Sequence, residues 1–144
     1  MVALYVLVIG GITGAWLDLF HQHIAPAPPI ACYQHDVRVV VLSSARLFAA
    51  PAIACSFQLV IVDIDNGDGT DPLALCRRLR TLYQGALLLI SGNMDENYIQ
   101  EAYAAGVDEC IAKPVDLLQL RAKLISWLER IHNAGNLSDR QGNM

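Results

Sequence analysis

Short apolar runs alternate with amphipathic segments along most of this chain. The runs are rich in Val, Ile and Leu, and they have the length of strands that are buried on both faces of a sheet. Between them, apolar residues recur at helical spacing, as Leu75, Leu79 and Leu82 do. Strands are predicted over residues 2–9, 37–42, 57–63, 86–90 and 107–112, and the last is expected at a sheet edge because it is the least apolar.

Capping residues and prolines predict where the helices begin. Asp71 precedes Pro72, and Asp95 and Asp116 also stand where a side-chain acceptor caps a first turn. Gly106 marks a helix end, and Ile99, Ala102 and Tyr103 are expected to face inward. The predicted helices cover residues 15–23, 45–56 with a disturbance at Pro51, 71–82, 95–105 and 116–131.

Five strands that alternate with helices predict an α/β fold with a five-stranded parallel sheet, doubly wound in the flavodoxin-like (βα)5 manner. The 144 residues fit one domain, expected over residues 1–132, and residues 133–144 read as a polar tail or linker. This organisation brings the carboxyl ends of the strands to one edge of the sheet, where open α/β folds bind ligands.

Charge and composition exclude several function classes. The net charge of -4 and the pI near 5.4 argue against direct nucleic-acid binding. The apolar N-terminal stretch is broken by Gly10, Gly11 and Gly14 and lacks a basic residue before it, so it predicts a strand and turn rather than a membrane span or signal peptide. Four cysteines without Cys-x-x-Cys spacing indicate buried thiols in a reducing compartment, and a cytoplasmic location is expected.

Three residues with complementary chemistry follow three of the predicted strands. Asp63 ends the run Phe-Gln-Leu-Val-Ile-Val-Asp, Ser91 follows Leu-Leu-Leu-Ile, and Lys113 ends Asp-Glu-Cys-Ile-Ala-Lys. A carboxylate at such a position can accept a phosphoryl group, while a hydroxyl and an ammonium can hold its oxygens. Each residue alone has an ordinary structural explanation, but the three together predict a phosphate-facing site.

These segments resemble the receiver domain of two-component response regulators. The resemblance is carried by residues 57–63, by Ile-Ser-Gly at 90–92, by Ala-Gly-Val-Asp at 105–108 and by the Lys113-Pro114 pair. It implies that Asp63 is the phosphorylation site, that Ser91 is the switch hydroxyl and that Lys113 and Pro114 belong to the phosphate-contacting set. It further implies that Asp63 and the backbone of Asp65 help to bind Mg²⁺.

The chain departs from the pattern of that family at four positions. Gly10 and Gly11 stand where the family has an acidic pair that holds Mg²⁺, a cation that requires oxygen ligands. Gly67 replaces the usual proline after the acceptor. Cys110 replaces the aromatic residue that the family places three residues before the lysine. Mg²⁺ binding beside Asp63 is therefore expected to be weakened. The conformational response that the family couples to phosphorylation through the aromatic residue is expected to be weakened as well.

The leading hypothesis is a degenerate receiver in which phosphorylation of Asp63 is impaired or absent, and which acts through protein–protein interaction or dimerisation rather than as an enzyme. The resemblance implies a histidine kinase or phosphotransfer protein, an effector domain and a second copy of the chain as partners. A second hypothesis is a small-ligand domain that binds a nucleotide or flavin with the turn at Gly10–Gly14. A third is a purely structural dimerisation domain with a permanent Asp63–Lys113 salt bridge.

Overall fold

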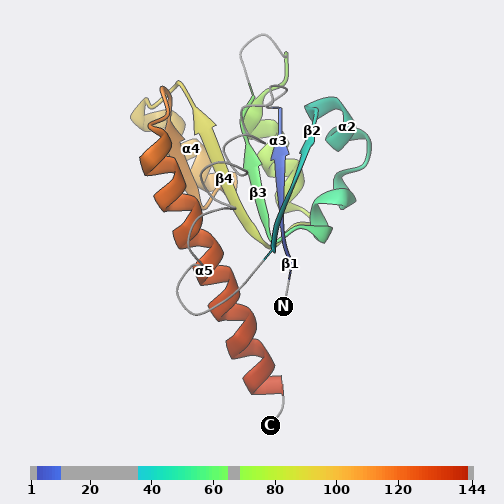
Figure 1. Cartoon of the computed structure of the whole chain (residues 1–144). Coiled ribbons are helices and arrows are strands. Elements are labelled where there is room, and N and C mark those ends of the chain that lie inside the picture. The colour runs from blue at the N-terminus through green and yellow to red at the C-terminus, as the bar shows by residue number, and fades with distance from the viewer. Residues whose placement is uncertain (1–2, 11–35, 65–68, 143–144) are drawn as a thin grey trace.

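A computed structural model describes residues 3–10, 36–64 and 69–142. In these residues a five-stranded parallel sheet has the order β2-β1-β3-β4-β5 (Figure 1). The strands are β1 (Ala3–Ile9), β2 (Asp36–Leu42), β3 (Leu59–Val62), β4 (Ala86–Ser91) and β5 (Glu109–Ala112). The predicted α/β fold with a parallel sheet is confirmed, and β5 lies at a sheet edge as expected.

The described helices are α2 (Ser44–Ala49), the 3-10 helix η2 (Pro51–Ser56), α3 (Pro72–Arg80), α4 (Glu96–Ala104) and α5 (Leu117–Gly142). Pro51 divides the predicted helix over 45–56 into α2 and η2, which confirms the expected disturbance. Asp71 caps α3 by accepting a hydrogen bond from the Leu73 N–H at 3.1 Å. Asp116 caps α5 in the same way, with the Leu118 N–H at 2.9 Å. The predicted helix over 15–23 lies outside the described residues.

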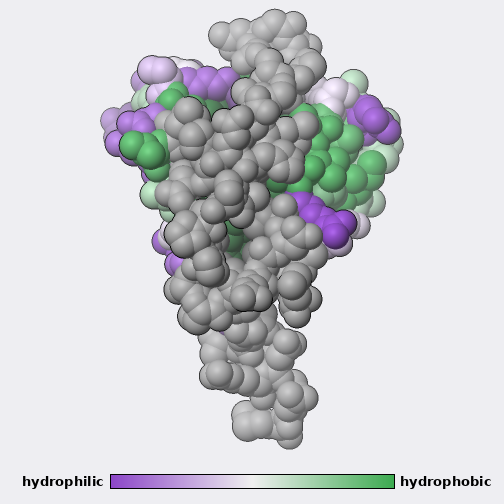
Figure 2. Space-filling model, in the orientation of Figure 1, coloured by the Kyte–Doolittle hydropathy of each residue, from purple (hydrophilic) through white to green (hydrophobic). Residues whose placement is uncertain are grey.

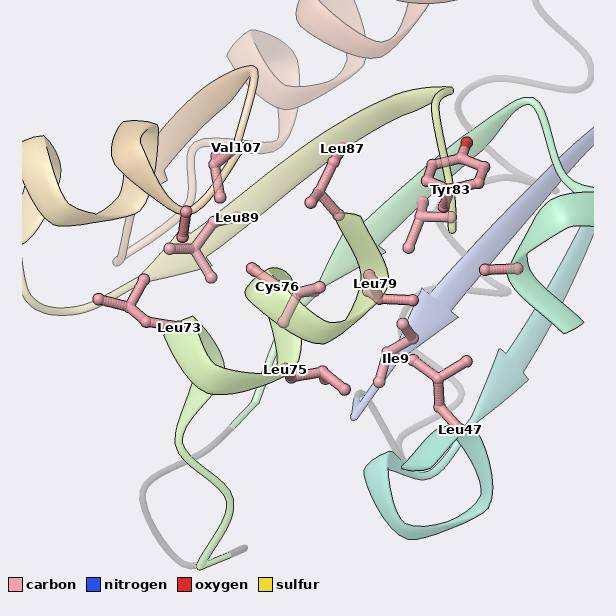
Figure 3. Packing of buried hydrophobic residues seen from close by; sticks show 14 of the residues in the cluster. Ile9, Leu47, Leu73, Leu75, Cys76, Leu79, Tyr83, Leu87, Leu89 and Val107 are labelled. Atoms are coloured by element: carbon pink, nitrogen blue, oxygen red, sulfur yellow. The ribbon is translucent and has the colours of Figure 1, made fainter. Parts of the chain in front are cut away.

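Two apolar clusters cover the two faces of the sheet, as alternation along each strand requires. On one face the strands pack against α2, α3 and α4, and Figure 3 shows Ile9 near Leu79 and Leu89 near Val107 in this cluster. On the other face they pack against α5, which buries Leu120, Leu124 and Leu128 there. Nearly all inward side chains of β1, β3 and β4 are fully buried, which explains why these strands read as continuous apolar runs.

Three details differ from expectation. The strand predicted over residues 37–42 is β2, which forms the second sheet edge rather than a covered strand, and Val40 is 39% exposed there. Figure 2 shows hydrophobic residues gathered on this side of the molecule, over β2 and α2. Tyr103 of α4 is 48% exposed and not inward, whereas Tyr98 of the same helix packs against the core. The last helix continues to Gly142, past its predicted end at residue 131, and its final turns extend beyond the sheet (Figure 1).

Candidate functional site

The strand order places the three predicted residues at the same edge of the sheet. Asp63 directly follows β3, Ser91 ends β4, and Lys113 directly follows β5. The Lys113 Nζ lies 2.7 Å from the Asp63 Oδ1. The Lys113 N–H donates to the Ser91 carbonyl at 2.9 Å, which continues the β4–β5 ladder by one bond beyond the strand ends. The Lys113–Pro114 peptide bond is cis. The structure therefore brings together the trio that the sequence suggested, while the phosphorylation and switch roles of these residues stay predictions.

The Asp63–Lys113 ion pair is largely withdrawn from solvent. The side chain of Asp63 is 17% exposed and that of Lys113 is 30% exposed. Charges in such a setting attract each other more strongly than surface pairs, but both have lost much of their hydration. Removing either partner would leave the other charge in a poorly hydrated place, so the two residues depend on each other.

Gly10 lies beside Asp63 and is held in a conformation that excludes other residues. Ile9 and Val62 are partners in the β1–β3 register, so the next residues along the two strands, Gly10 and Asp63, are neighbours. The φ of Gly10 is +95°, in the left-handed region. A Cβ placed on it would lie 2.5 Å from the Asp63 carbonyl oxygen and 2.9 Å from a side-chain carbon of Ile64. The backbone at position 10 therefore leaves no room for the first residue of the acidic pair.

The described residues do not form a magnesium cradle by themselves. Mg²⁺ needs several oxygen ligands in near-octahedral geometry. Asp63 offers a carboxylate, but Gly10 has no side chain, and among residues 3–10, 36–64 and 69–142 no group of three or more His, Cys, Asp or Glu residues gathers to hold a metal. Gly11, Asp65 and Gly67 lie outside the described residues, and so does the Gly-rich turn from Gly11 to Gly14.

A cleft of about 680 Å³ opens next to the ion pair. Its polar lining comes from the strand ends and from the first turns of two helices: Asp71, Ser91, Asn93, Tyr98 and Lys113. Ile64, Pro72 and Ile90 add apolar surface. The volume lies within the range of small-molecule sites and is much larger than one phosphoryl group.

Tyr98 is a residue of this cleft that the sequence analysis did not select. It lies in the first turns of α4, packs partly buried against the main apolar cluster, and lines the cleft together with Ser91. Burial raises the pKa of its hydroxyl, and the nearby Ser91 side chain opposes that rise. Tyr98 is therefore a protonated phenol at neutral pH. Its spacing from Ile99 and Ala102 was the available signal, but helical periodicity alone assigned the inward position to Tyr103.

Cys110 lies on the neighbouring strand, where the resembled family has an aromatic residue. It is partly buried against the main apolar cluster. Burial and the nearby Glu109 raise the pKa of this thiol. A thiol is much smaller than an aromatic ring, and the aromatic residue that lines the cleft with Ser91 is Tyr98.

Arg80, at the opposite end of the sheet, is a structural clamp that sequence reasoning also missed. Its guanidinium donates to the carbonyls of Gly106 at 2.7 Å, Tyr83 at 2.9 Å and Gly85 at 2.7 Å, and to the Asp108 carboxylate at 2.7 Å. Asp108 also accepts from the Leu87 N–H at 2.8 Å. This network joins the end of α3 to the turns that precede β4 and β5, and so fixes the strands that carry Ser91 and Lys113.

The comparisons with known proteins agree with this geometry. Residues 30–125 match the response regulator receiver domain family, which is most of the chain. The chain therefore belongs to the response regulator receiver domain family, whose members act in two-component signalling. The comparison with curated proteins gives no match.

Solved structures share the fold at low sequence identity. A two-component response regulator from Clostridium difficile has a TM-score of 0.66 at 18% identity, over 89% of this chain and 98% of that one. The Vibrio cholerae chemotaxis protein CheY4 has a TM-score of 0.64 at 16% identity, over 88% and 99%. A putative pilus assembly protein, CpaE, from Burkholderia thailandensis has a TM-score of 0.58 at 20% identity, over 90% and 98%. These likenesses confirm the flavodoxin-like receiver fold.

None of the helices in the described part of the chain has both the length and the apolar character needed to span a membrane.

Proposed function

We propose that this chain is a degenerate receiver in which Mg²⁺-dependent phosphorylation of Asp63 is impaired or absent, and that it acts in the cytoplasm as an interaction module rather than as an enzyme. The single observation that carries the proposal is Gly10. It is the neighbour of Asp63 across the β1–β3 ladder, it offers no oxygen ligand, and its positive φ and the 2.5 Å approach of the Asp63 carbonyl leave no room for an acidic side chain.

The electrostatics of Asp63 support the same proposal. Its carboxylate is already neutralised by Lys113 at 2.7 Å. Phosphoryl transfer to a carboxylate needs positive charge that offsets the approach of an anionic donor, which a metal ion usually supplies. No acidic side chain at position 10 helps to hold a metal ion. Lys113 must therefore offset the charges of both the Asp63 carboxylate and the anionic donor, and the site has less positive charge than one that holds Mg²⁺.

The test of this part is direct phosphorylation. The full chain is incubated with acetyl phosphate and Mg²⁺, and its intact mass is compared with that of an Asp63→Asn variant treated in parallel. We expect at most a small phosphorylated fraction at Asp63. Stoichiometric addition of one phosphoryl group that is absent from the variant would overturn the proposal and make the chain an ordinary receiver.

The proposed output surface consists of α4, β5 and α5, and its proposed partner is a second copy of the chain or an effector protein. Two large apolar side chains on these elements are exposed, Tyr103 at 48% and Leu118 at 74%. An apolar side chain as exposed as Leu118 gains free energy when a partner covers it. A histidine kinase or phosphotransfer protein is the partner that would address Asp63 itself.

Sedimentation over a range of concentrations tests this surface. If the chain dimerises through it, Leu118→Glu weakens the dimer because it places a charge in an apolar contact. Leu82→Glu is the matched control, since Leu82 is 37% exposed but lies after α3, away from this surface. A dimer that resists Leu118→Glu, or that is equally sensitive to Leu82→Glu, would place the interface elsewhere. A strictly monomeric chain would leave effector binding as the output.

A further inference from the structure

We propose that copies of this chain associate head to tail, with an apolar surface that carries arginines on one copy docked on an acidic surface of the next. The first, the α2 surface, consists of Val40, Arg46, Phe48, Ile53 and Arg78. The second, the α4 surface, consists of Asp95, Glu96, Glu101 and Tyr103. The inference deepens the proposed interaction module and rests on it, because it names which surface of a second copy meets α4.

The α2 surface exposes apolar side chains next to a sheet edge. Val40 of β2 and Ile53 of η2 are each 39% exposed. Val40 alternates along β2 with Val39 and Val41, which pack toward α5, so it points to the face of the sheet that α2 and η2 cover. Figure 2 shows hydrophobic residues gathered over β2 and α2. Covering such a surface with a partner is favourable because it removes apolar area from water.

The same surface is positively charged. Arg46 is exposed on α2, and the guanidinium of Arg78 extends from α3 to lie over the Phe48 ring at 5.6 Å. The Arg78 guanidinium also lies 3.5 Å from the Phe48 carbonyl oxygen, which holds this charge beside α2. No Asp or Glu occurs between residues 37 and 62 or between residues 72 and 94. A partner that complements this surface must therefore be acidic.

The α4 surface has the opposite charge. Residues 81–112 contain five Asp or Glu residues and no Lys or Arg. Asp95, Glu96 and Glu101 are exposed on α4 or at its first turn, and within the described residues none of them forms an ion pair. Tyr103 follows Glu96 by seven residues, about two helical turns, so its half-exposed ring shares a face with that carboxylate. The chain itself thus supplies an acidic surface with an apolar side chain.

The two surfaces lie on opposite sides of the molecule. β2 and β5 form the two edges of the sheet, and Figure 1 shows α2 beside β2 and α4 on the side of β4. One copy cannot join its own two surfaces. A symmetric contact centred on either surface would oppose arginine to arginine or carboxylate to carboxylate, which disfavours it. The pairing that charge favours is the α2 surface on the α4 surface of the next copy, a heterologous contact that repeats along a row of molecules.

Charge and apolar area contribute differently to this contact. Exposed ion pairs add little affinity each and are screened by salt, but they set which surfaces meet and in which orientation. Burial of the Tyr103 ring against the apolar side chains of the α2 surface adds affinity that salt does not screen. We therefore expect association that increases with protein concentration, decreases with added salt and does not stop at two copies.

Sedimentation velocity of the full chain over a wide range of protein concentration, at low and at high salt, is the first test. At low salt the average sedimentation coefficient should rise beyond the value for two copies. Arg46→Glu should weaken the association by roughly five- to thirtyfold, because a repulsion replaces an attraction. Arg77→Glu is the matched control, since it makes the same change of charge at an exposed position of α3 outside the α2 surface, and it should change the association by no more than about twofold.

A mixing experiment tests the head-to-tail arrangement itself. Tyr103→Glu should block the α4 surface, as Arg46→Glu blocks the α2 surface, so each variant alone should be mainly monomeric. An equimolar mixture should form a dimer with one copy of each variant, because each copy still has the surface that the other needs. The mixture should stop at that dimer, since both remaining surfaces are then negatively charged. Far-ultraviolet circular dichroism shows that each variant is folded.

A wild-type chain that stays monomeric at the highest concentration, association that resists Arg46→Glu, an equal loss in Arg77→Glu, or a mixture that stays monomeric would each overturn the inference. Association that is lost in Leu118→Glu but kept in Arg46→Glu would also overturn it, and would leave a symmetric dimer through α4, β5 and α5 as the form of the interaction module. Phosphorylation of Asp63 by acetyl phosphate bears on the proposed degeneracy alone, so the two can fail separately.

Discussion

Replacing Gly10 by alanine tests the claim that the backbone at this position excludes any side chain. The residue has a φ of +95°, and a left-handed conformation costs an L-residue about 1–2 kcal/mol. The new Cβ would lie 2.5 Å from the Asp63 carbonyl oxygen, and relief of such an overlap in a packed site costs roughly another 1–3 kcal/mol. Alanine also raises the free energy of unfolding by about 0.5–1 kcal/mol, because it reduces the conformational entropy of the unfolded chain.

The sum is a loss of about 1–4.5 kcal/mol in the free energy of unfolding, compared with the roughly 5–15 kcal/mol that a domain of this kind has. The assay is urea unfolding followed by far-ultraviolet circular dichroism and Trp fluorescence. Gly92→Ala is the matched control, because a Cβ there meets nothing within 4 Å and the glycine is exposed. If Gly10→Ala unfolds at the same urea concentration as wild type, the backbone can accept a side chain, and Gly10→Asp should then be tested for Mg²⁺ binding.

Three other outcomes are expected. Arg80→Ala should lower the free energy of unfolding by about 3–5 kcal/mol, because it removes four hydrogen bonds of 2.7–2.9 Å. Replacing the exposed Arg77 by alanine is the control and should change it by less than about 0.5 kcal/mol. Similar urea midpoints for the two variants would refute the clamp. Burial raises the pKa of Cys76 from 9.0 to about 12, so on raising the pH the thiol loses its proton in the unfolded chain first. Between pH 9 and about pH 12 this residue should lower the free energy of unfolding by up to about 1.4 kcal/mol per pH unit. The slope of the free energy of unfolding against pH should decrease in Cys76→Ala, and an unchanged slope would contradict this prediction. Iodoacetamide at mildly alkaline pH should modify the exposed Cys55 well before the buried Cys76, which peptide mass mapping can measure. Equal rates of modification at the two cysteines would mean that α3 opens readily.

Much of the fold follows from local patterns in the sequence. Strands covered on both faces are continuous apolar runs, and Asp71 and Asp116 announce the helices that they cap. The edge position of β2 could not be read in this way, because Val-Val-Val-Leu has the same composition as a central strand and only the strand order leaves Val40 exposed.

The candidate site divides along the same line. Asp63, Ser91 and Lys113 were recognisable because parallel strand ends converge, and their neighbours were not. Tyr98 and Tyr103 lie about 140° apart around α4, and only the packing of the helix decides that Tyr98 turns toward the core while Tyr103 is exposed. Arg80 is one of three arginines in the last turn of α3, and two of its four partners, Gly106 and Asp108, are adjacent to it only in the folded chain.

The anchoring of α5 has a mechanical consequence. Trp127 donates to Glu109 of β5 at 2.8 Å, and Arg130 lies over the Trp127 ring at 4.9 Å. From that anchor to Gly142 the helix continues for roughly 20 Å at 1.5 Å per residue. The anchor lies on the strand that leads to Lys113, and the helix projects from it. A tilt of about ten degrees at the anchor would displace the far end by roughly 4 Å, which converts a small shift of β5 into a movement large enough for a partner protein to detect.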